Sequence, residues 1–245
     1  MCIRDSYNIF FNSILNNGCR VLESPLVYDG EGHYTIDWTD LEAKLADPQT
    51  TLMILCNPHN PIDRIWDRET LERIGELCWE HHVTVISDEI HCDLTDPGFA
   101  YVPFASVSEH CAMNSVTCMA PTKTFNIAGL QNSFAVIPND TLGKKFDAYV
   151  KTVRIKKGVS LGYIAAEAGF REGAPWLEEV LEYLKGNYDL LKKTLTDALP
   201  EIHIDPLEST YMIWVDLSAY VKPEQVVEVV QNQARLAVDF GFWFW

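Results

Sequence analysis

Three short apolar runs, each ending in a cluster of polar residues, constrain the fold of this chain most. The runs span residues 51–55, 83–86 and 115–119 and read TLMIL, VTVI and SVTCM. Their length and composition are typical of buried strands, and the connections between them are long enough for crossover segments. The pattern therefore predicts an α/β fold built on a mostly parallel sheet.

Polar side chains follow each of the three runs. Asn60 stands in the proline-rich segment CNPHNP after the first run, Asp88 and His91 follow the second, and Lys123 follows the third. The prolines prevent the first strand from continuing. Because ligands of open α/β sheets bind outside the carboxyl ends of the strands, we expect Asn60, Asp88, His91 and Lys123 to line one crevice.

A lysine directly after a buried strand either points to water or is used for its amine, because a buried ammonium is costly unless it is paired or neutral. A reactive lysine, a carboxylate and hydrogen-bonding side chains together are what pyridoxal 5'-phosphate requires. Simpler interpretations stay open for each residue. Lys123 can be solvated, Asp88 can cap a turn, Asn60 can form an Asx turn before Pro61, and His91 can be an ordinary imidazole.

Other patterns predict the remaining elements. Gly18 is expected to end the first helix, and Asp67 to cap the helix that precedes the second strand. Predicted helices span residues 7–18, 37–46, 68–82, 141–157, 175–199 and 223–235, and further strands span 19–23, 133–137 and 210–215.

The residues also carry a resemblance to a known family. Segments 55–61, 87–94 and 120–131 resemble, in order and spacing, the three signature blocks of class I/II aminotransferase-fold (fold type I) pyridoxal phosphate enzymes. More narrowly they resemble the MalY/PatB branch of cystathionine β-lyases and cysteine-S-conjugate β-lyases. The resemblance runs from about Tyr7 to Trp245. It implies a large cofactor-binding domain over residues 1–186 and part of a small α+β C-terminal domain over 187–245, with a boundary near Gly186.

The resemblance assigns a role to five residues. Lys123 would carry the cofactor covalently and remove the Cα proton of the substrate. Asp88 would pair with the pyridine nitrogen, and Asn60 would bond the phenolate oxygen. His91, where many aminotransferases of this fold have tyrosine, would contact the cofactor, and Thr122 would bond its phosphate.

The sequence departs from the family pattern in several places. Gln131 stands where many relatives outside the branch carry a phosphate-binding arginine. Asp63 stands where the motif usually continues to glycine, and it would be strained if its φ were positive. The N-terminal arm, the glycine-rich phosphate loop and the arginine that binds the substrate carboxylate have no counterpart, so we expect a chain truncated at both ends.

The implied reaction is α,β-elimination of cystathionine or a related cysteine S-conjugate, a small sulfur amino acid, to a thiol, pyruvate and ammonia. Two alternatives stay open: a class I/II aminotransferase that uses the same residues, and a catalytically inactive fragment. A metal hydrolase is disfavoured, because its candidate ligands show no zinc-site spacing and no metal is expected. Those candidates are His59, His81, His82, His91 and Cys92.

The composition limits the kinds of partner and the cellular compartment that we expect for this chain. A formal charge of -16, from 35 acidic and 19 basic residues, argues against nucleic acid or an anionic membrane as a partner. The seven cysteines form no Cys-x-x-Cys pair and are expected to be thiols in a reducing compartment. No apolar run is long enough to span a membrane. The expected location is the cytoplasm, and the resemblance implies a homodimer in the full-length parent.

Overall fold

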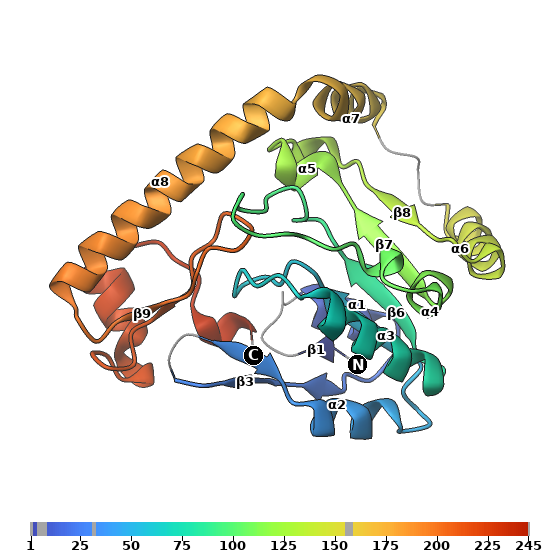
Figure 1. Cartoon of the computed structure of the whole chain (residues 1–245), viewed down its shortest axis with the longest axis horizontal. Coiled ribbons are helices and arrows are strands. Elements are labelled where there is room, and N and C mark those ends of the chain that lie inside the picture. Colours follow the sequence, from blue (N-terminus) through green and yellow to red (C-terminus); the bar gives the residue numbers. More distant parts are fainter. Residues whose placement is uncertain (1, 4–8, 31–32, 155–158, 245) are drawn as a thin grey trace.

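A six-stranded sheet lies at the centre of the computed structural model, which describes residues 2–3, 9–30, 33–154 and 159–244 (Figure 1). Its strand order is β2-β1-β5-β6-β7-β8. All neighbours pair in parallel except β8, which is antiparallel to β7. The predicted, mostly parallel α/β sheet is therefore confirmed. The strands are β1 (Cys2–Ile3), β2 (Glu23–Ser24), β5 (Leu52–Cys56), β6 (Thr84–Asp88), β7 (Ser115–Met119) and β8 (Phe134–Val136).

The three apolar runs of the sequence form the adjacent strands β5, β6 and β7. Asp88 lies opposite Cys56 on one side and Cys118 on the other, so the carboxyl ends of these strands are level. Met53, Leu55 and Val85 are buried in the core beneath them. The register therefore places the segments that follow the three strands at one edge of the sheet.

Helices cover the sheet and supply the crossovers. Helix α3 (Arg68–Glu80) connects β5 to β6, and its predicted N-cap is confirmed: the Asp67 carboxylate accepts a hydrogen bond from the Thr70 amide at 2.7 Å. Leu71 and Ile74 bury the inner face of this helix. The other helices are α1 (Ile9–Asn16), α2 (Trp38–Leu45), α4 (Glu109–Met113), α5 (Pro121–Thr124), α6 (Asp140–Thr152), α7 (Ser160–Glu172) and α8 (Ala174–Ala198).

A second, smaller core lies beyond the sheet. The long helix α8, orange in Figure 1, leads to the C-terminal segment, drawn in red. Tyr188 packs there with Ile202, Ile204 and Leu207. In this region β9 (His203–Ile204) and β10 (Val215–Asp216) pair antiparallel. Helix α8 is continuous through Gly186, and the domain boundary near that residue stays a prediction.

Several local predictions need correction. The strand expected over 19–23 is only β2, and that over 210–215 is only β10. Over 223–235 the chain forms a 3-10 turn (Pro223–Gln225) and a π-helix (Glu228–Gln233). Helix α7 and the hairpin of β3 (Leu26–Tyr28) with β4 (Tyr34–Ile36) were not expected. Residues 7–8 and 155–157 of the predicted helices lie outside the described residues.

Two further findings bear on the class of protein. Among the described residues, no helix combines the length and apolarity needed to cross a membrane. The cysteines whose side chains the structure describes are free thiols, and of these Cys56, Cys78, Cys92 and Cys111 are buried.

Candidate active site

Lys123 lies at the carboxyl edge of the sheet, on the short helix α5 that follows β7. Pro121 occupies the first turn of α5, where its missing amide hydrogen costs nothing. Thr122 is buried, and Lys123 itself is half-buried. Its Nζ atom lies 6.0 Å from the centre of the Tyr211 ring. The predicted lysine is therefore partly withdrawn from solvent rather than placed on a free loop.

Asp88, the last residue of β6, combines two roles that the sequence left as alternatives. Its Oδ1 accepts a hydrogen bond from the Ile90 amide at 3.2 Å, so the residue does cap a turn. Burial raises the pKa of the Asp88 carboxyl, while the Ile90 amide and the charge of Lys123 oppose that rise. Because the turn uses Oδ1, the Oδ2 atom can still pair with a cation.

His91 is buried next to the same lysine. Burial, and secondarily the positive charge of Lys123, lowers the pKa of His91 to about 4. Its ring is therefore neutral at pH 7, with one nitrogen that donates and one that accepts. The Nδ1 atom is buried without a hydrogen-bond partner among the described residues. The Tyr211 ring meets the imidazole edge-on, with centres 5.6 Å apart.

Asn60 follows β5 at the same edge of the sheet. Its Oδ1 atom is buried and makes no hydrogen bond to the described residues, so the Asx turn considered for this residue is not made through that oxygen. The structure thus groups Lys123 with Asp88 and His91, sets Thr122 beside the lysine in α5, and brings Asn60 to the same edge.

This set of groups fits the pyridoxal phosphate that the sequence resemblance implied. Asn60 and His91 each have a buried polar atom with unused hydrogen-bonding capacity, and such atoms are normally satisfied by protein, water or ligand. The Asp88 carboxyl and the Lys123 amine lie in the same group of residues. The part of the site that would hold a phosphate is less complete, because Thr122 is the one predicted residue that would contact it.

Glu89 is a buried acid that sequence reasoning missed. Its Oε1 accepts hydrogen bonds from Ser87 Oγ at 2.8 Å and from the Phe104 amide at 2.9 Å, and its Oε2 bonds the Tyr101 hydroxyl. Burial raises the pKa of Glu89 to about 7. Successive residues of a strand point to opposite faces, and this alternation is the one signal that separates Glu89 from Asp88.

Replacing Glu89 by glutamine should flatten the pH dependence of stability between about pH 4.5 and 7. The folded chain keeps the Glu89 proton up to a pKa of about 7, whereas the unfolded chain loses it near 4.5. Stability therefore falls as pH rises through this window. Glutamine keeps an acceptor toward Ser87 and Phe104 but cannot ionise.

Urea unfolding of both chains from pH 4 to 8 measures this effect. Burial also raises the pKa of Asp205 to about 7. Asp205 titrates in both chains, so the difference between their two curves reports Glu89 alone. Parallel curves across the window would contradict the assignment.

The strain expected at Asp63 is confirmed, because its φ is 59°. The side chain is buried and bonds the hydroxyl of Thr210, which also has a positive φ, of 66°. Burial raises the pKa of Asp63 well above its usual range.

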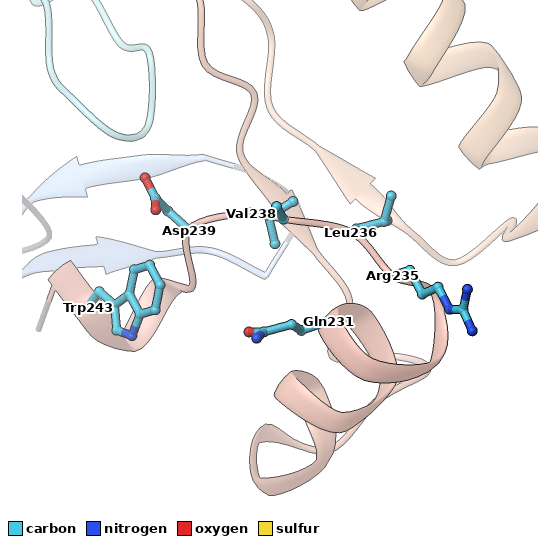
Figure 2. A pocket seen from close by; sticks show the side chains of 7 residues that line it. Gln231, Arg235, Leu236, Val238, Asp239 and Trp243 are labelled. Atoms are coloured by element: carbon cyan, nitrogen blue, oxygen red, sulfur yellow. The ribbon is translucent and has the colours of Figure 1, made fainter.

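Two other features lie apart from this group. A hollow between segment 235–239 and Trp243 is lined by none of the predicted site residues (Figure 2). Among the described residues, no three His, Cys, Asp or Glu side chains are grouped so that they could hold a metal ion.

Comparison with known proteins identifies the family. The model of the family "Aminotransferase class I and II" matches residues 7–242. The chain belongs to this family. It is 45% identical to the cystathionine β-lyase PatB of Bacillus subtilis (strain 168) over 214 residues, which cover 87% of this chain and 55% of that protein. It is 32% identical to the protein MalY of Escherichia coli (strain K12), covering 97% of this chain and 60% of that one.

The structural comparison agrees with the sequence comparison. The pyridoxal phosphate-bound C–S lyase of Staphylococcus hominis superposes with a TM-score of 0.91 at 32% identity, and the match covers 99% of this chain and 62% of that one. The chain thus spans somewhat more than half the length of the relatives it matches.

Proposed function

We propose that the chain provides the cofactor-binding core of a pyridoxal phosphate-dependent C–S β-lyase, which eliminates a thiol from cystathionine or a related cysteine S-conjugate. The observation that carries the proposal is the grouping of the Lys123 amine with the Asp88 carboxyl and the neutral His91 ring at the carboxyl edge of the sheet. The printed names of PatB and of the Staphylococcus hominis lyase support this reaction class.

Each site residue has a task in this proposal. When bound, pyridoxal phosphate supplies an electron sink for the negative charge that forms at the substrate Cα. Lys123 holds the cofactor covalently and moves the Cα proton. Asp88 pairs with the ring nitrogen, Asn60 bonds the phenolate oxygen, and Thr122 bonds the phosphate. His91 bonds the cofactor through its Nδ1 atom, which has no hydrogen-bond partner among the described residues.

The two predicted groups that lie with Lys123, His91 and Asp88, differ in charge. His91 stays neutral because burial lowers its pKa, so it can bond a ligand without adding charge. Asp88 is the acidic group of the site. Burial raises the pKa of its carboxyl, and the charge of Lys123 lowers it.

A class I/II aminotransferase would use the same lysine, aspartate and asparagine. The β-lyase is favoured because His91 replaces the tyrosine of many aminotransferases, and because the relative with 45% identity is named a cystathionine β-lyase. An inactive chain is the remaining alternative.

The test starts with the visible spectrum of the purified chain after addition of pyridoxal phosphate, followed by borohydride reduction and peptide mapping. We expect a new visible band and a reduced pyridoxyl adduct confined to Lys123. Cystathionine should then yield pyruvate without any added 2-oxo acid. Turnover only with an added 2-oxo acid would indicate an aminotransferase, and a folded chain without the band would indicate an inactive one.

We also propose a cytoplasmic location and a homodimeric full-length parent. The support for the location is the set of free thiols, which suits a reducing compartment. The support for the dimer is the number of large apolar side chains exposed on α7, among them Leu161, Ile164 and Phe170.

A further inference from the structure

Tyr211 is an aromatic residue of the site that was not among the predicted site residues. Its ring lies 6.0 Å from the Lys123 amine, measured to the ring centre, and edge-on to His91. Although its ring lies near both groups, the residue is 44% exposed. The ring thus presents free apolar surface beside the reactive amine.

The backbone on both sides of Tyr211 is firmly held. The Thr210 amide donates to the Leu94 carbonyl at 2.8 Å, and the Met212 amide donates to Thr210 Oγ1 at 3.0 Å. Before it, Ser209 pairs as a β-bridge with Thr95, and its hydroxyl donates to the His91 carbonyl at 3.4 Å. The segment is therefore tied to the same loop that carries His91.

Two strained residues complete this attachment. Thr210 and Asp63 both have positive φ, which is unfavourable for any residue with a Cβ and most so for β-branched threonine. Strained conformations persist where surrounding contacts enforce them, and they gather at functional sites. Here the enforcing contact is the buried hydrogen bond that the Thr210 hydroxyl donates to the Asp63 carboxyl group.

We propose that Tyr211 is a specificity-determining residue whose ring forms the wall for the sulfur substituent of the substrate, and that Asp63 and Thr210 are the positioning residues that hold it. This inference rests on the proposed β-lyase function. It assigns as substrates those cysteine S-conjugates whose sulfur carries an apolar or aromatic group.

The distances support this role. A carbon that gives its proton to Lys123 must come to roughly 3 Å from the amine nitrogen. A ring centred 6.0 Å from the same nitrogen is therefore within reach of a substituent on that substrate's side chain. Thioether sulfur and aromatic groups both pack favourably on an aromatic ring.

The test compares two amino acids that have a methyl group in place of the Cα hydrogen and so cannot react, 2-aminoisobutyrate and S-benzyl-α-methylcysteine. Their Kd values are measured by the visible spectrum of the chain loaded with pyridoxal phosphate. The unaltered chain should prefer the S-benzyl compound. In Tyr211→Ala the ratio of the two Kd values should be roughly tenfold smaller than in the unaltered chain. Tyr211→Phe should keep the ratio, because the ring and not the hydroxyl makes the contact.

The positioning residues are tested with a matched pair of variants at Thr210. Thr210→Val keeps the branched shape but removes the hydroxyl that bonds Asp63, whereas Thr210→Ser keeps the hydroxyl. We expect Thr210→Val to reduce the preference for the S-benzyl compound and Thr210→Ser to retain it. Equal preference in the two variants would show that the bond to Asp63 does not position the ring.

The failure of this inference is distinct from the failure of the proposed function. If the unaltered chain forms no adduct at Lys123, the proposed function fails, and this inference with it. If the adduct forms at Lys123 but the unaltered chain shows no preference, or binds neither compound, the wall assigned to Tyr211 is wrong. An adduct at Lys123 with an unchanged preference in Tyr211→Ala, confirmed with Tyr211→Leu, would also overturn it.

Discussion

Replacing Lys123 by alanine will abolish the reduced pyridoxyl adduct and lower pyruvate formation from cystathionine by at least about 10³-fold. The same amine is proposed to hold the cofactor and to move the Cα proton, and a positioned acid–base group alone contributes about 10²–10⁴ in rate. Loss of covalent attachment removes a second contribution. Borohydride labelling with peptide mapping, and a pyruvate assay on the loaded chain, measure the two effects separately.

Lys185→Ala is the matched control for this experiment. Lys185 is an exposed lysine on α8 whose Nζ lies 3.4 Å from Asp189, and such a surface ion pair contributes little to stability. We expect this variant to keep both the adduct and the activity. Lys123→Arg keeps a positive charge near Asp88 but has no amine that can attach the cofactor, so it should be as inactive as alanine. Persistent activity in Lys123→Ala would refute the assignment.

The sheet and the grouping of polar residues at its carboxyl edge could be predicted, because their signals are local. Continuous apolar runs indicate buried strands, and parallel strands necessarily bring their carboxyl ends to one edge. That reasoning was enough to group Asp88, His91 and Lys123, which the structure brings together. The helix N-cap at Asp67 could be predicted for the same reason, since it depends on residues within one helical turn.

The segment around Tyr211 could not be predicted from its own residues. Its composition favours a strand over 210–215, yet only Val215 and Asp216 pair in one. Thr210 is held instead in a left-handed conformation by bonds to Asp63 and Leu94, which are remote in sequence. Strand propensity is weak enough for such contacts to override it. The aromatic beside the amine was therefore missed.

The adjacent acids Asp88 and Glu89 show a second limit of the sequence. Resemblance pointed to Asp88, and apart from the alternation of side chains along a strand nothing local indicated that Glu89 would be the more deeply buried of the two. Its partners, Tyr101 and the Phe104 amide, lie in a loop that follows much later in the chain. Which carboxyl faces the crevice, and which is enclosed by that loop, depends on the tertiary structure.

Replacing Asp88 by asparagine should lower activity and raise the stability of the cofactor-free chain at the same time. Asparagine keeps an acceptor for the Ile90 amide but lacks the negative charge proposed to pair with the pyridine nitrogen. Removing one electrostatic partner of the reacting system costs about 10²–10³ in rate. Because burial raises the pKa of the Asp88 carboxyl, its ionised form destabilises the fold at pH 7. Removing that charge should stabilise the chain.

For a chain of this size, a gain on the order of 1 kcal/mol corresponds to a rise of about 2–4 °C in Tm. Asp96→Asn is the matched control, because Asp96 Oδ1 accepts from the Gly98 amide at 2.9 Å and so caps a turn with the same spacing. This variant should leave Tm and pyruvate formation unchanged. Thermal unfolding of the cofactor-free variants and pyruvate assays of the loaded ones give the two readouts. A fall in Tm for Asp88→Asn would mean that the Asp88 carboxylate stabilises the fold. A rise in Tm together with a loss of pyruvate formation would mark it as a charge retained for function at the expense of stability.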